Sequence, residues 1–420
     1  MTKKRLVGLT ASICLILTVA VLPFAASCAP EEVAPPPEEA PPAPEYILFG
    51  QSTSLTGPYA PGVEALTRNN FEMWIEEVNA RGGLYIPEYE KRIPVKHIRY
   101  DDKSDIGEMT KLLEKLILDD KVHFLLPSWG TAMNVAAAPI ISKYGYPWIT
   151  ATCTSQKLTE ELAAGAFPYL FLILCQPSDI VPQQIDFLIE HGIKRIAVIY
   201  VSDEHGAEYK SVVVPYCEEK GVEIAVLRSY PLSPTDLAPL LKEVQAANVD
   251  ALIAYSYPEG TFLMTGQAIT LGLNLKVFSL GVGVPFPAYR DAFGADVVEG
   301  VMCYAPVSRY SSPKVEDFFQ RYEKRWDREP ETWGGIYTTI LCEIFEQCIE
   351  KVGLDRAKVR DMIATETFDT SVGPIKFVDN RNIYFMGLYG QWIDGDMHVI
   401  MPKDKRTHEP IFPKPEWPTE

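Results

Sequence analysis

Apolar positions along the chain alternate between short continuous runs and longer stretches with helical spacing. Runs typical of buried strands cover residues 46–50, 94–100, 122–126, 147–149, 195–201, 223–229, 250–255 and 276–280. A stretch long enough for a helix separates neighbouring runs, and in the first of these Val63, Leu66 and Trp74 fall on one helical face. This alternation predicts parallel sheets covered by helices on both faces. Because the repeats exceed what one sheet commonly holds, we expect two lobes.

The pattern changes after Pro306. Helical spacing covers 315–325, 336–352 and 356–365, and antiparallel strands are predicted at 375–378, 384–393 and 397–400. Residues 403–420 are charged and rich in proline, so we expect this C-terminal tail to lie loosely on the surface.

The N-terminus has the pattern of a targeting segment. Lys3, Lys4 and Arg5 precede an apolar run over 6–26, which is typical of a secretory signal. The small residues just before Cys28 resemble a bacterial lipobox, so we expect 1–27 to be a lipoprotein signal peptide and Cys28 to carry the lipid. An ordinary cleaved signal and a retained membrane anchor are the alternatives.

The segment that follows is expected to be a tether. Residues 29–45 contain seven prolines and five glutamates, a composition that cannot bury a core and favours an extended spacer. With Cys28 it forms the predicted tether 28–45. The chain as a whole has a net charge of −17, which disfavours nucleic acid as a partner.

Motifs for catalysis, cofactors and metals are absent from the sequence. It contains no GxSxG, HExxH, Walker loop or CxxC pair, and Gly281-Val282-Gly283 lacks the third glycine of a dinucleotide fingerprint. We therefore expect a protein without enzymatic activity, cofactor or metal. Asp101 and Asp102 are interpreted as a solvated cap. Buried free thiols are expected at the cysteines beyond the tether, which are Cys153, Cys175, Cys217, Cys303, Cys342 and Cys348.

Candidate ligand-binding residues follow four of the predicted strands. They are Tyr59, then Trp129, Gly130 and Thr131, then Thr152, Cys153 and Thr154, and finally Tyr257. In an open α/β sheet, ligands bind beyond the carboxyl ends of the strands. Free amides at a helix start, joined by hydroxyls, suit a carboxylate, and aromatic rings can supply apolar walls. Each hydroxyl alone is more simply a helix cap and each ring alone is core; their convergence favours a site.

Several stretches carry a family resemblance. These are LTGPY at 55–59, EEVNARGG at 76–83, YDD at 100–102, TSQKLT at 154–159 and GPIKF at 373–377. In this order, over about 46–400, the chain resembles the periplasmic substrate-binding proteins of ABC importers, in the leucine/isoleucine/valine-binding branch. The resemblance implies a type I periplasmic binding fold, an α/β architecture of two doubly wound Rossmann-like lobes joined by three hinge crossovers. Lobe 1 would hold 46–173 and 305–385, and lobe 2 would hold 174–304 and 386–402.

The resemblance also assigns roles at the site. It implies that Thr131 and Thr154 bind a ligand carboxylate, that the Thr152 carbonyl receives an ammonium, and that His205 and Tyr257 close over the ligand from lobe 2. Amino-acid binders of this family usually carry an acid after the strand at 276–280, whereas Val282 and its neighbours here are not acidic. A buried ammonium without a counter-charge would cost several kcal/mol. Glu259 is a candidate substitute, but we favour a carboxylate without an amine, with an amide or urea-like ligand as the alternative.

The resulting expectation is a solute-binding protein outside the cytoplasm, in the periplasm or at the cell surface, anchored by its lipid. Its partners would be a small-molecule ligand and the permease subunits of an ABC importer of the branched-chain amino acid type. A ligand-sensing receptor module of the same fold is one alternative. An anchored hydrolase that uses Asp101, Asp102 or His205 is another.

Overall fold

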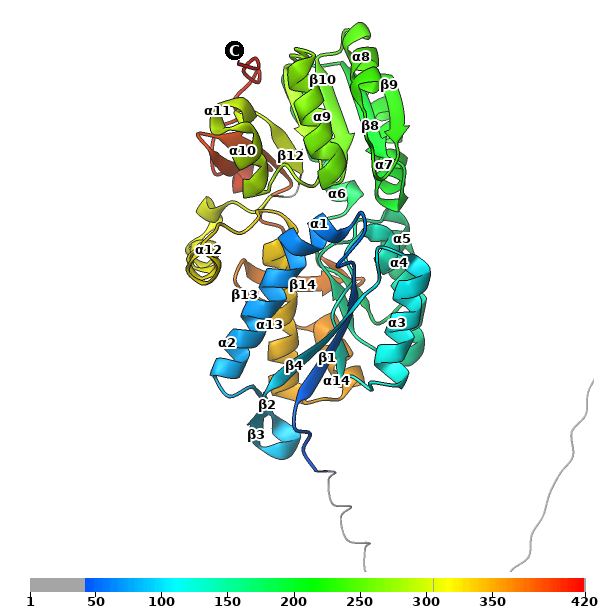
Figure 1. The fold of residues 1–420 in the computed structure, drawn as a ribbon, viewed down its shortest axis with the longest axis vertical. Helices are drawn as coiled ribbons and strands as arrows, with labels where there is room; N and C mark the ends of the chain where they lie inside the picture. Colours follow the sequence, from blue (N-terminus) through cyan, green and yellow to red (C-terminus); the bar gives the residue numbers. More distant parts are fainter. Residues whose placement is uncertain (1–41, 305, 419–420) are drawn as a thin grey trace, which may run out of the picture. The chain divides into compact units, whose positions relative to one another are not determined.

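The computed structural model describes residues 42–304 and 306–418 (Figure 1). The predicted signal peptide, Cys28 and most of the predicted tether therefore lie outside the described residues. Residues 43–420 form one compact unit. Within the described residues, no helix combines the length and the apolar character needed to cross a membrane.

Two sheets form what we call lobe 1. The first is parallel, with the order β4 (Val95–Asp101), β1 (Ile47–Thr53), β5 (Phe124–Leu125). The second has the order β13 (Thr367–Thr370), β14 (Gly373–Val378), β15 (Arg381–Asn382), β7 (Leu170–Leu172), β6 (Trp148–Thr150). A small hairpin of β2 (Leu84–Ile86) and β3 (Lys91–Ile93) stands beside them. All but one residue of β1 is buried, as expected of a parallel strand covered on both faces.

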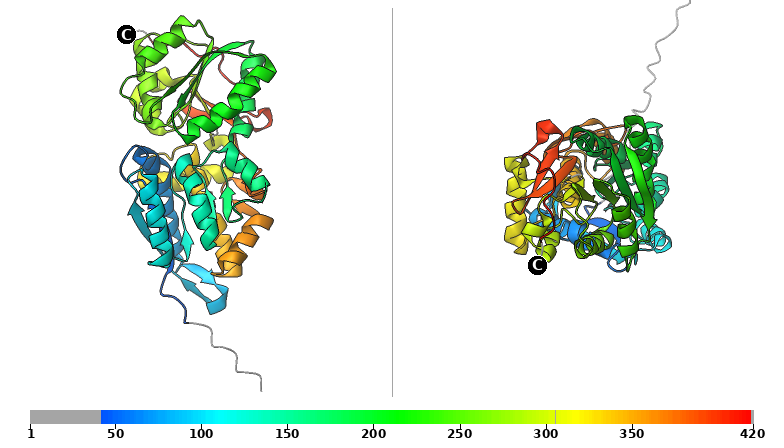
Figure 2. Two further views of the ribbon diagram at one scale, coloured as in Figure 1. Left: turned by 90° about the vertical axis from the view of Figure 1, so that its right-hand side faces the viewer. Right: turned by 90° about the horizontal axis from the view of Figure 1, so that it is seen from above.

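One seven-stranded sheet forms lobe 2. Its order is β17 (Asp396–Met401), β16 (Tyr389–Ile393), β12 (Met302–Tyr304), β11 (Val277–Leu280), β10 (Ala251–Tyr255), β8 (Arg195–Val201), β9 (Glu223–Tyr230). β8 to β12 are parallel, and β16 and β17 are antiparallel. Helices lie on either side of this sheet (Figure 2). Every residue of β10 is buried, which explains its continuous apolar run.

Helices connect the strands, and side chains cap several of their starts. The helices of lobe 1 are α1 (Ala60–Val63), the π-helix η1 (Glu64–Arg68), α2 (Asn69–Ala80), the 3-10 turn η2 (Pro87–Tyr89), α3 (Ile106–Leu118), α4 (Thr131–Tyr144), α5 (Gln156–Ala163), α12 (Pro313–Trp326), α13 (Gly334–Val352) and α14 (Arg356–Thr365). Those on the lobe 2 side are α6 (Pro177–Glu190), α7 (Glu204–Lys220), α8 (Ala238–Ala246), α9 (Pro258–Thr270), α10 (Pro287–Phe293) and α11 (Ala295–Val298), with the 3-10 turn η4 (Lys403–Lys405). The 3-10 turn η3 (Arg309–Ser311) lies between β12 and α12. Asp105, Ser155, Asp203 and Ser312 each accept a hydrogen bond from a backbone N–H in the first turn of their helix, as good N-cap residues do.

The chain changes sheet three times. It leaves lobe 1 after β7, returns after β12, and leaves again after β15. The predicted α/β fold with two doubly wound lobes and three crossovers is thereby confirmed. The exact lobe limits at 173/174, 304/305 and 385/386 remain predictions. Four of the three-residue strands, β2, β3, β7 and β12, were not predicted, because so short a run leaves little pattern in a sequence.

The expectation for the C-terminal tail was wrong. The Trp417 ring is 5% exposed and packs edge-on against Phe278, and its indole N–H donates to the Leu273 carbonyl at 2.8 Å. Further up the tail, the Ile411 N–H donates to the Gln391 side chain. The buried Trp417 therefore holds the C-terminal tail against lobe 2, although the charge and proline content of the tail indicated a loose segment.

Candidate ligand-binding cleft

Aromatic side chains from both lobes meet in one buried cluster. The ring centroids of Tyr59 and Trp129 are 5.4 Å apart, those of Trp129 and Tyr257 5.0 Å, and those of Tyr59 and Tyr257 5.7 Å. His205 stacks on Tyr257 with a centroid distance of 4.8 Å. All four side chains are at most 5% exposed. The structure thus brings together Tyr59, Trp129 and Tyr257, which the sequence placed after separate strands, and His205, which the family resemblance assigned to the site.

Two glycines make this packing possible. A side chain at Gly62 would put a Cβ 2.2 Å from the Trp129 indole, so only glycine lets α1 lie on that ring. Gly130 has a φ of +100°, a backbone conformation that side-chain-bearing residues rarely adopt, and it turns the chain into α4.

A line of hydrogen bonds runs beside the aromatic cluster. The Thr131 hydroxyl accepts from the Thr154 N–H at 3.3 Å, and the Thr154 hydroxyl lies 2.8 Å from Nδ1 of His205. On its other side, Nε2 of His205 lies 2.8 Å from the Tyr304 hydroxyl. Burial lowers the pKa of His205 to about 3, so the ring is neutral and one of its nitrogens donates while the other accepts. Thr131 and Thr154 therefore lie together, as predicted, and face lobe 2 through His205.

Thr152 and Cys153 are engaged by other polar groups of the fold. The Thr152 hydroxyl donates to the Ser128 carbonyl at 3.2 Å. Cys153 is fully buried, and burial raises the pKa of its thiol. Its carbonyl accepts from the Gln176 side chain. The predicted contact between the Thr152 carbonyl and a ligand ammonium remains a prediction.

Two buried donors in the cluster have no partner among the described residues. They are the indole N–H of Trp129 and the hydroxyl of Tyr257. They lie beside the start of α4, whose N-cap is a glycine and offers no side-chain acceptor. The first N–H groups of a helix have no partner within the helix. These groups are donors of the kind from which a ligand carboxylate accepts hydrogen bonds.

A carboxylate that sequence analysis missed also reaches the cluster. Oδ1 of Asp203 accepts from the Gly206 N–H and caps α7, while Oδ2 accepts from the Tyr59 hydroxyl of lobe 1 at 3.4 Å. Burial raises the pKa of Asp203 to about 6. The loop around Val282 has no acid, as noted, and Glu259 is exposed on the first turn of α9. Asp203 was missed because an aspartate before a helix predicts only a cap.

Comparison with known proteins decides the family. A model of the periplasmic binding protein family matches residues 47–393. The chain belongs to this family. Leu/Ile/Val-binding protein homolog 7 of Brucella abortus is 24% identical over 372 residues, which cover 85% of this chain and 91% of the relative. Homolog 8 of the same organism is 22% identical and covers 88% and 93% of the two chains.

Solved structures of several bacterial binding proteins share the fold. The leucine-binding protein LivK of Thermotoga maritima superposes with a TM-score of 0.72 at 18% identity, covering 85% of this chain and 99% of that one. LivJ of Streptococcus pneumoniae, in complex with isoleucine, gives 0.71 at 17% identity, with 84% and 96% covered. A solute-binding protein of R. palustris, in complex with benzoate, gives 0.72 at 19% identity, with 84% and 94% covered.

Membership of a periplasmic binding protein family has two direct consequences. It implies a location outside the cytoplasm, and the relatives are substrate-binding proteins and not enzymes. The protein is therefore a binding protein, and the hydrolase alternative is dropped. Both nitrogens of His205 already lie at hydrogen-bond distance from hydroxyls within the fold, which fits that conclusion.

The acidic pair of this binding protein serves its fold. Asp101 accepts hydrogen bonds from the N–H groups of Leu55 and Thr56. Asp102 is fully buried and accepts from the hydroxyls of Ser52 and Ser54 at 3.3 and 2.5 Å. The interpretation of a solvated cap was wrong for Asp102, because its hydroxyl partners, Ser52 on β1 and Ser54 just after it, stand about 50 residues earlier in the chain. The two acids fix the loop that carries Tyr59.

A second missed carboxylate joins the lobes of this binding protein. Glu208 of α7 is 6% exposed and accepts from the Ser155 hydroxyl at 2.7 Å and from the N–H groups of Gln156 and Lys157 at 2.8 and 3.1 Å. It thus binds the N-terminus of α5, where a negative charge is favourable. In sequence it resembles any solvated acid on a helix.

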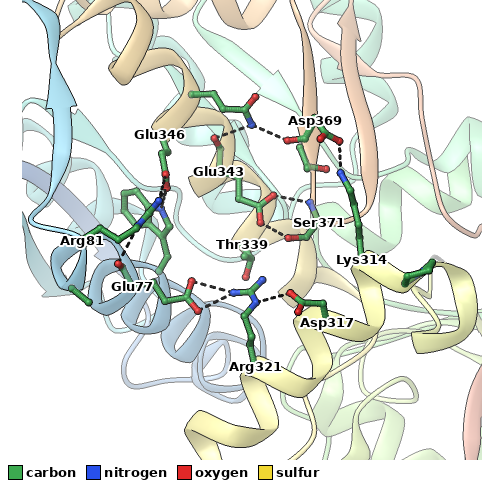
Figure 3. Close-up of a pocket in the computed structure, with 15 residues that line it drawn as sticks. Glu77, Arg81, Lys314, Asp317, Arg321, Thr339, Glu343, Glu346, Asp369 and Ser371 are labelled. Carbon is green, nitrogen blue, oxygen red and sulfur yellow. Dashed lines mark hydrogen bonds and ion pairs between the residues drawn. The ribbon is translucent and has the colours of Figure 1, made fainter.

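A cavity of about 870 Å³ lies away from this cluster, on lobe 1 (Figure 3). Its walls are ion-paired with one another: Arg81 contacts Glu346 at 2.8 Å, and Arg321 contacts Glu77 at 2.8 Å. Because these charged side chains pair with each other, they do not indicate a binding site for a charged ligand. All six cysteines of the described residues are buried and free, as predicted.

Proposed function

We propose that this protein is the solute receptor of an ABC importer of the branched-chain amino acid type. It binds a small carboxylate or amino-acid-like ligand between its lobes, closes by hinge rotation, and delivers the ligand unchanged to the permease subunits. The observation that carries the proposal is the buried cluster of Tyr59, Trp129, His205 and Tyr257, which spans both lobes and contains two unpartnered donors.

The ligand acceptor would bind among these donors. A carboxylate could accept from the indole of Trp129, from the Tyr257 hydroxyl and from the first N–H groups of α4. Gly130, Thr131 and Thr154 frame that place from lobe 1. Leaving two buried donors unsatisfied costs about 1–3 kcal/mol each, and a bound carboxylate would recover this free energy.

Closure would rest on contacts that join the lobes. Three hydrogen-bonded pairs do so: Thr154 with His205, Tyr59 with Asp203, and Ser155 with Glu208. A ligand can drive closure only by the difference between its affinities for the closed and the open form. A ligand held by Trp129 on one lobe and Tyr257 on the other has such a difference, because only the closed form offers both.

The ligand class depends on Asp203. We favoured a carboxylate without an amine because the loop around Val282 lacks an acid, but Asp203 brings a carboxylate to the cluster from another loop. An ammonium on the ligand would thus have a counter-charge. The fold accommodates both classes, since LivJ is solved with isoleucine and the R. palustris protein with benzoate. Our proposal therefore covers carboxylates with and without an amine.

Pairs of ligands that differ mainly in the amine test both the proposed binding function and the proposed ligand class. Leucine with 4-methyl-2-oxopentanoate, and phenylalanine with phenylpyruvate, differ mainly in the amine. Titration of the full chain, followed by intrinsic fluorescence and by calorimetry, should show saturable binding of at least one member. Native mass spectrometry of the freshly purified protein should identify a co-purified carboxylate. A protein that binds no small carboxylate in either measurement would contradict the proposal.

The lipid anchor is a separate part of the proposal. The pattern that ends at Cys28 and the proline- and glutamate-rich stretch after it support a lipidated, tethered receptor. Intact-mass analysis of the membrane fraction should show a chain that begins at Cys28 and carries acyl groups. A Cys28→Ala variant should lose the acyl mass. An unmodified chain that starts at another residue would contradict lipidation without affecting the ligand site.

A further inference from the structure

A second pocket, of about 690 Å³, lies on lobe 1 at the opposite end of the strands from the aromatic cluster. Its lining includes Lys121 and His123 just before β5, Tyr146 just before β6 and Tyr169 just before β7. These positions mark the amino ends of the strands, whereas the cleft residues follow the carboxyl ends. Arg356, at the start of α14, forms another wall. The pocket is therefore distinct from the proposed solute site.

Arg356 stands apart from the other arginines. The described residues include 15 arginines, and 14 of them form an ion pair with an aspartate or glutamate. Arg356 is the exception within that part of the chain. Its charge is permanent, since an arginine does not lose its proton in a protein. The Arg356 guanidinium is half-buried and has no ion pair, although the chain has a net charge of −17. Such an unpaired cation indicates a binding site for an anion.

The guanidinium of Arg356 is also held in position. Its central carbon lies 3.9 Å from the ring centroid of Tyr146, which is only 3% exposed. The Tyr146 hydroxyl donates to the Val122 carbonyl at 2.9 Å and so fixes the ring. Stacking on a fixed ring orients the guanidinium and leaves its N–H edge free to donate.

Further donors line the same pocket. Nδ1 of His123 accepts from the Leu48 N–H at 3.0 Å, so the proton of the neutral ring is on Nε2. Burial, assisted by the charge of Arg356, lowers the pKa of His123 and keeps the ring neutral. The Lys121 ammonium and the Tyr169 ring complete this part of the lining. The pocket thus offers the two-pronged N–H edge of a guanidinium, an ammonium and an imidazole N–H. One acid, Asp355, also lines it, but its carboxylate caps α14 by accepting from the N–H groups of Ala357 and Lys358.

We propose that this pocket binds the phosphate group of an organic phosphate. Three kinds of donor on separate elements exceed what the two oxygens of a carboxylate need, and they suit a tetrahedral oxyanion. The volume far exceeds that of a phosphate ion, so the organic part of the molecule would lie against the tyrosine rings. Two sources share this chemistry, a soluble phosphate monoester and a phospholipid headgroup. Leu48, bonded to His123, follows the predicted lipidation site Cys28 by only 20 residues, which favours the headgroup.

Calorimetry on the full chain in non-ionic detergent tests the proposal. The probes are glycerol 1-phosphate, dihexanoyl phosphatidylglycerol below its micelle concentration, and sodium acetate. We expect saturable binding of at least one phosphate probe, and the tighter of the two identifies the source. Saturable binding of neither, or acetate binding as tightly as both, would overturn the assignment.

Arg360 supplies a matched control. It lies on the same helix and stacks on Tyr169 at 4.9 Å, but it is ion-paired with Asp361. Arg356→Gln should weaken phosphate binding by about tenfold or more, whereas Arg360→Gln should change it by less than about twofold. Arg356→Lys keeps the positive charge but lacks the paired N–H groups of the guanidinium, so it should give an intermediate loss of affinity. This second variant keeps the test decisive if Arg356→Gln does not fold. Equal affinities of Arg356→Gln or Arg356→Lys and Arg360→Gln would contradict the proposal.

Discussion

The Thr154 hydroxyl and Nδ1 of His205 lie 2.8 Å apart and join the two lobes through one buried hydrogen bond. Thr154 follows β6 of lobe 1, and His205 lies in the first turn of α7 of lobe 2. The other ring nitrogen lies at hydrogen-bond distance from Tyr304, so both nitrogens of the imidazole have a partner in this structure. Under the proposed hinge closure, opening of the lobes would break the bond to Thr154, and the bond would stabilise the closed form specifically.

Thr154→Val should loosen the closed form. The change keeps the shape of the side chain but leaves a buried imidazole nitrogen without a partner, at a cost of about 1–3 kcal/mol. We expect a lower melting temperature and weaker ligand binding. Thr159→Val is the control, because its hydroxyl bonds the Ser155 carbonyl within lobe 1. If both variants lose ligand affinity equally, the Thr154 bond has no special role in closure.

Glu208→Gln should weaken the contact between α7 and α5. The carboxylate accepts from one hydroxyl and two N–H groups, and hydrogen bonds to a charged group contribute about 1.5–3 kcal/mol each. The amide retains part of this, so we expect a loss of about 1–2 kcal/mol in the free energy of unfolding. Glu218→Gln, at an exposed position of the same helix, should be neutral. Denaturant unfolding measures both variants; identical curves would refute the role of Glu208.

Asp203 should make stability depend on pH. Burial raises its pKa from 3.8 to about 6, so the folded state holds a proton that the unfolded state releases. The stabilisation from this proton is complete below about pH 4 and is lost as the pH rises through 6. Asp203→Asn should therefore gain stability relative to the wild type between pH 4 and pH 7, by about 2–3 kcal/mol. Unfolding curves of the two proteins that stay parallel over this range would contradict the shift.

The same variant separates the two ligand classes. If the ligand carries an amine, Asp203→Asn should weaken its binding by about tenfold or more, because a buried ammonium loses its counter-charge. A deaminated analogue should bind the variant at least as well as it binds the wild type. Calorimetry with leucine and 4-methyl-2-oxopentanoate, or with the phenylalanine pair, measures the difference. An amine-bearing ligand that binds both proteins equally would show that Asp203 is not its partner.

Trp417→Ala should destabilise lobe 2 by about 3 kcal/mol, because a buried ring and its hydrogen bond are lost together. Trp417→Phe keeps the contact with Phe278 and should lose less. Thermal unfolding measures both variants. An unchanged melting temperature for Trp417→Ala would mean that the tail contributes nothing to the fold.

Local pattern and resemblance together predicted most of the fold and the meeting of Tyr59, Trp129 and Tyr257. The continuous apolar run of β10 identified a strand covered on both faces, and the loops after such strands placed Tyr59, Trp129 and Tyr257 near one another. Asp203 and Glu208 were missed, because what distinguishes them is a partner more than 50 residues away. Spacing within a helix cannot show that Glu208 meets the start of α5.

Small-angle scattering of the ligand-stripped full chain tests the hinged receptor most directly. The titrant is the molecule that native mass spectrometry identifies in the purified protein or, failing that, the best binder of the matched pairs. We predict that the radius of gyration falls as the site saturates, and that Thr154→Val needs more ligand for the same decrease. Saturable binding with an unchanged radius of gyration would contradict closure of the lobes around the ligand.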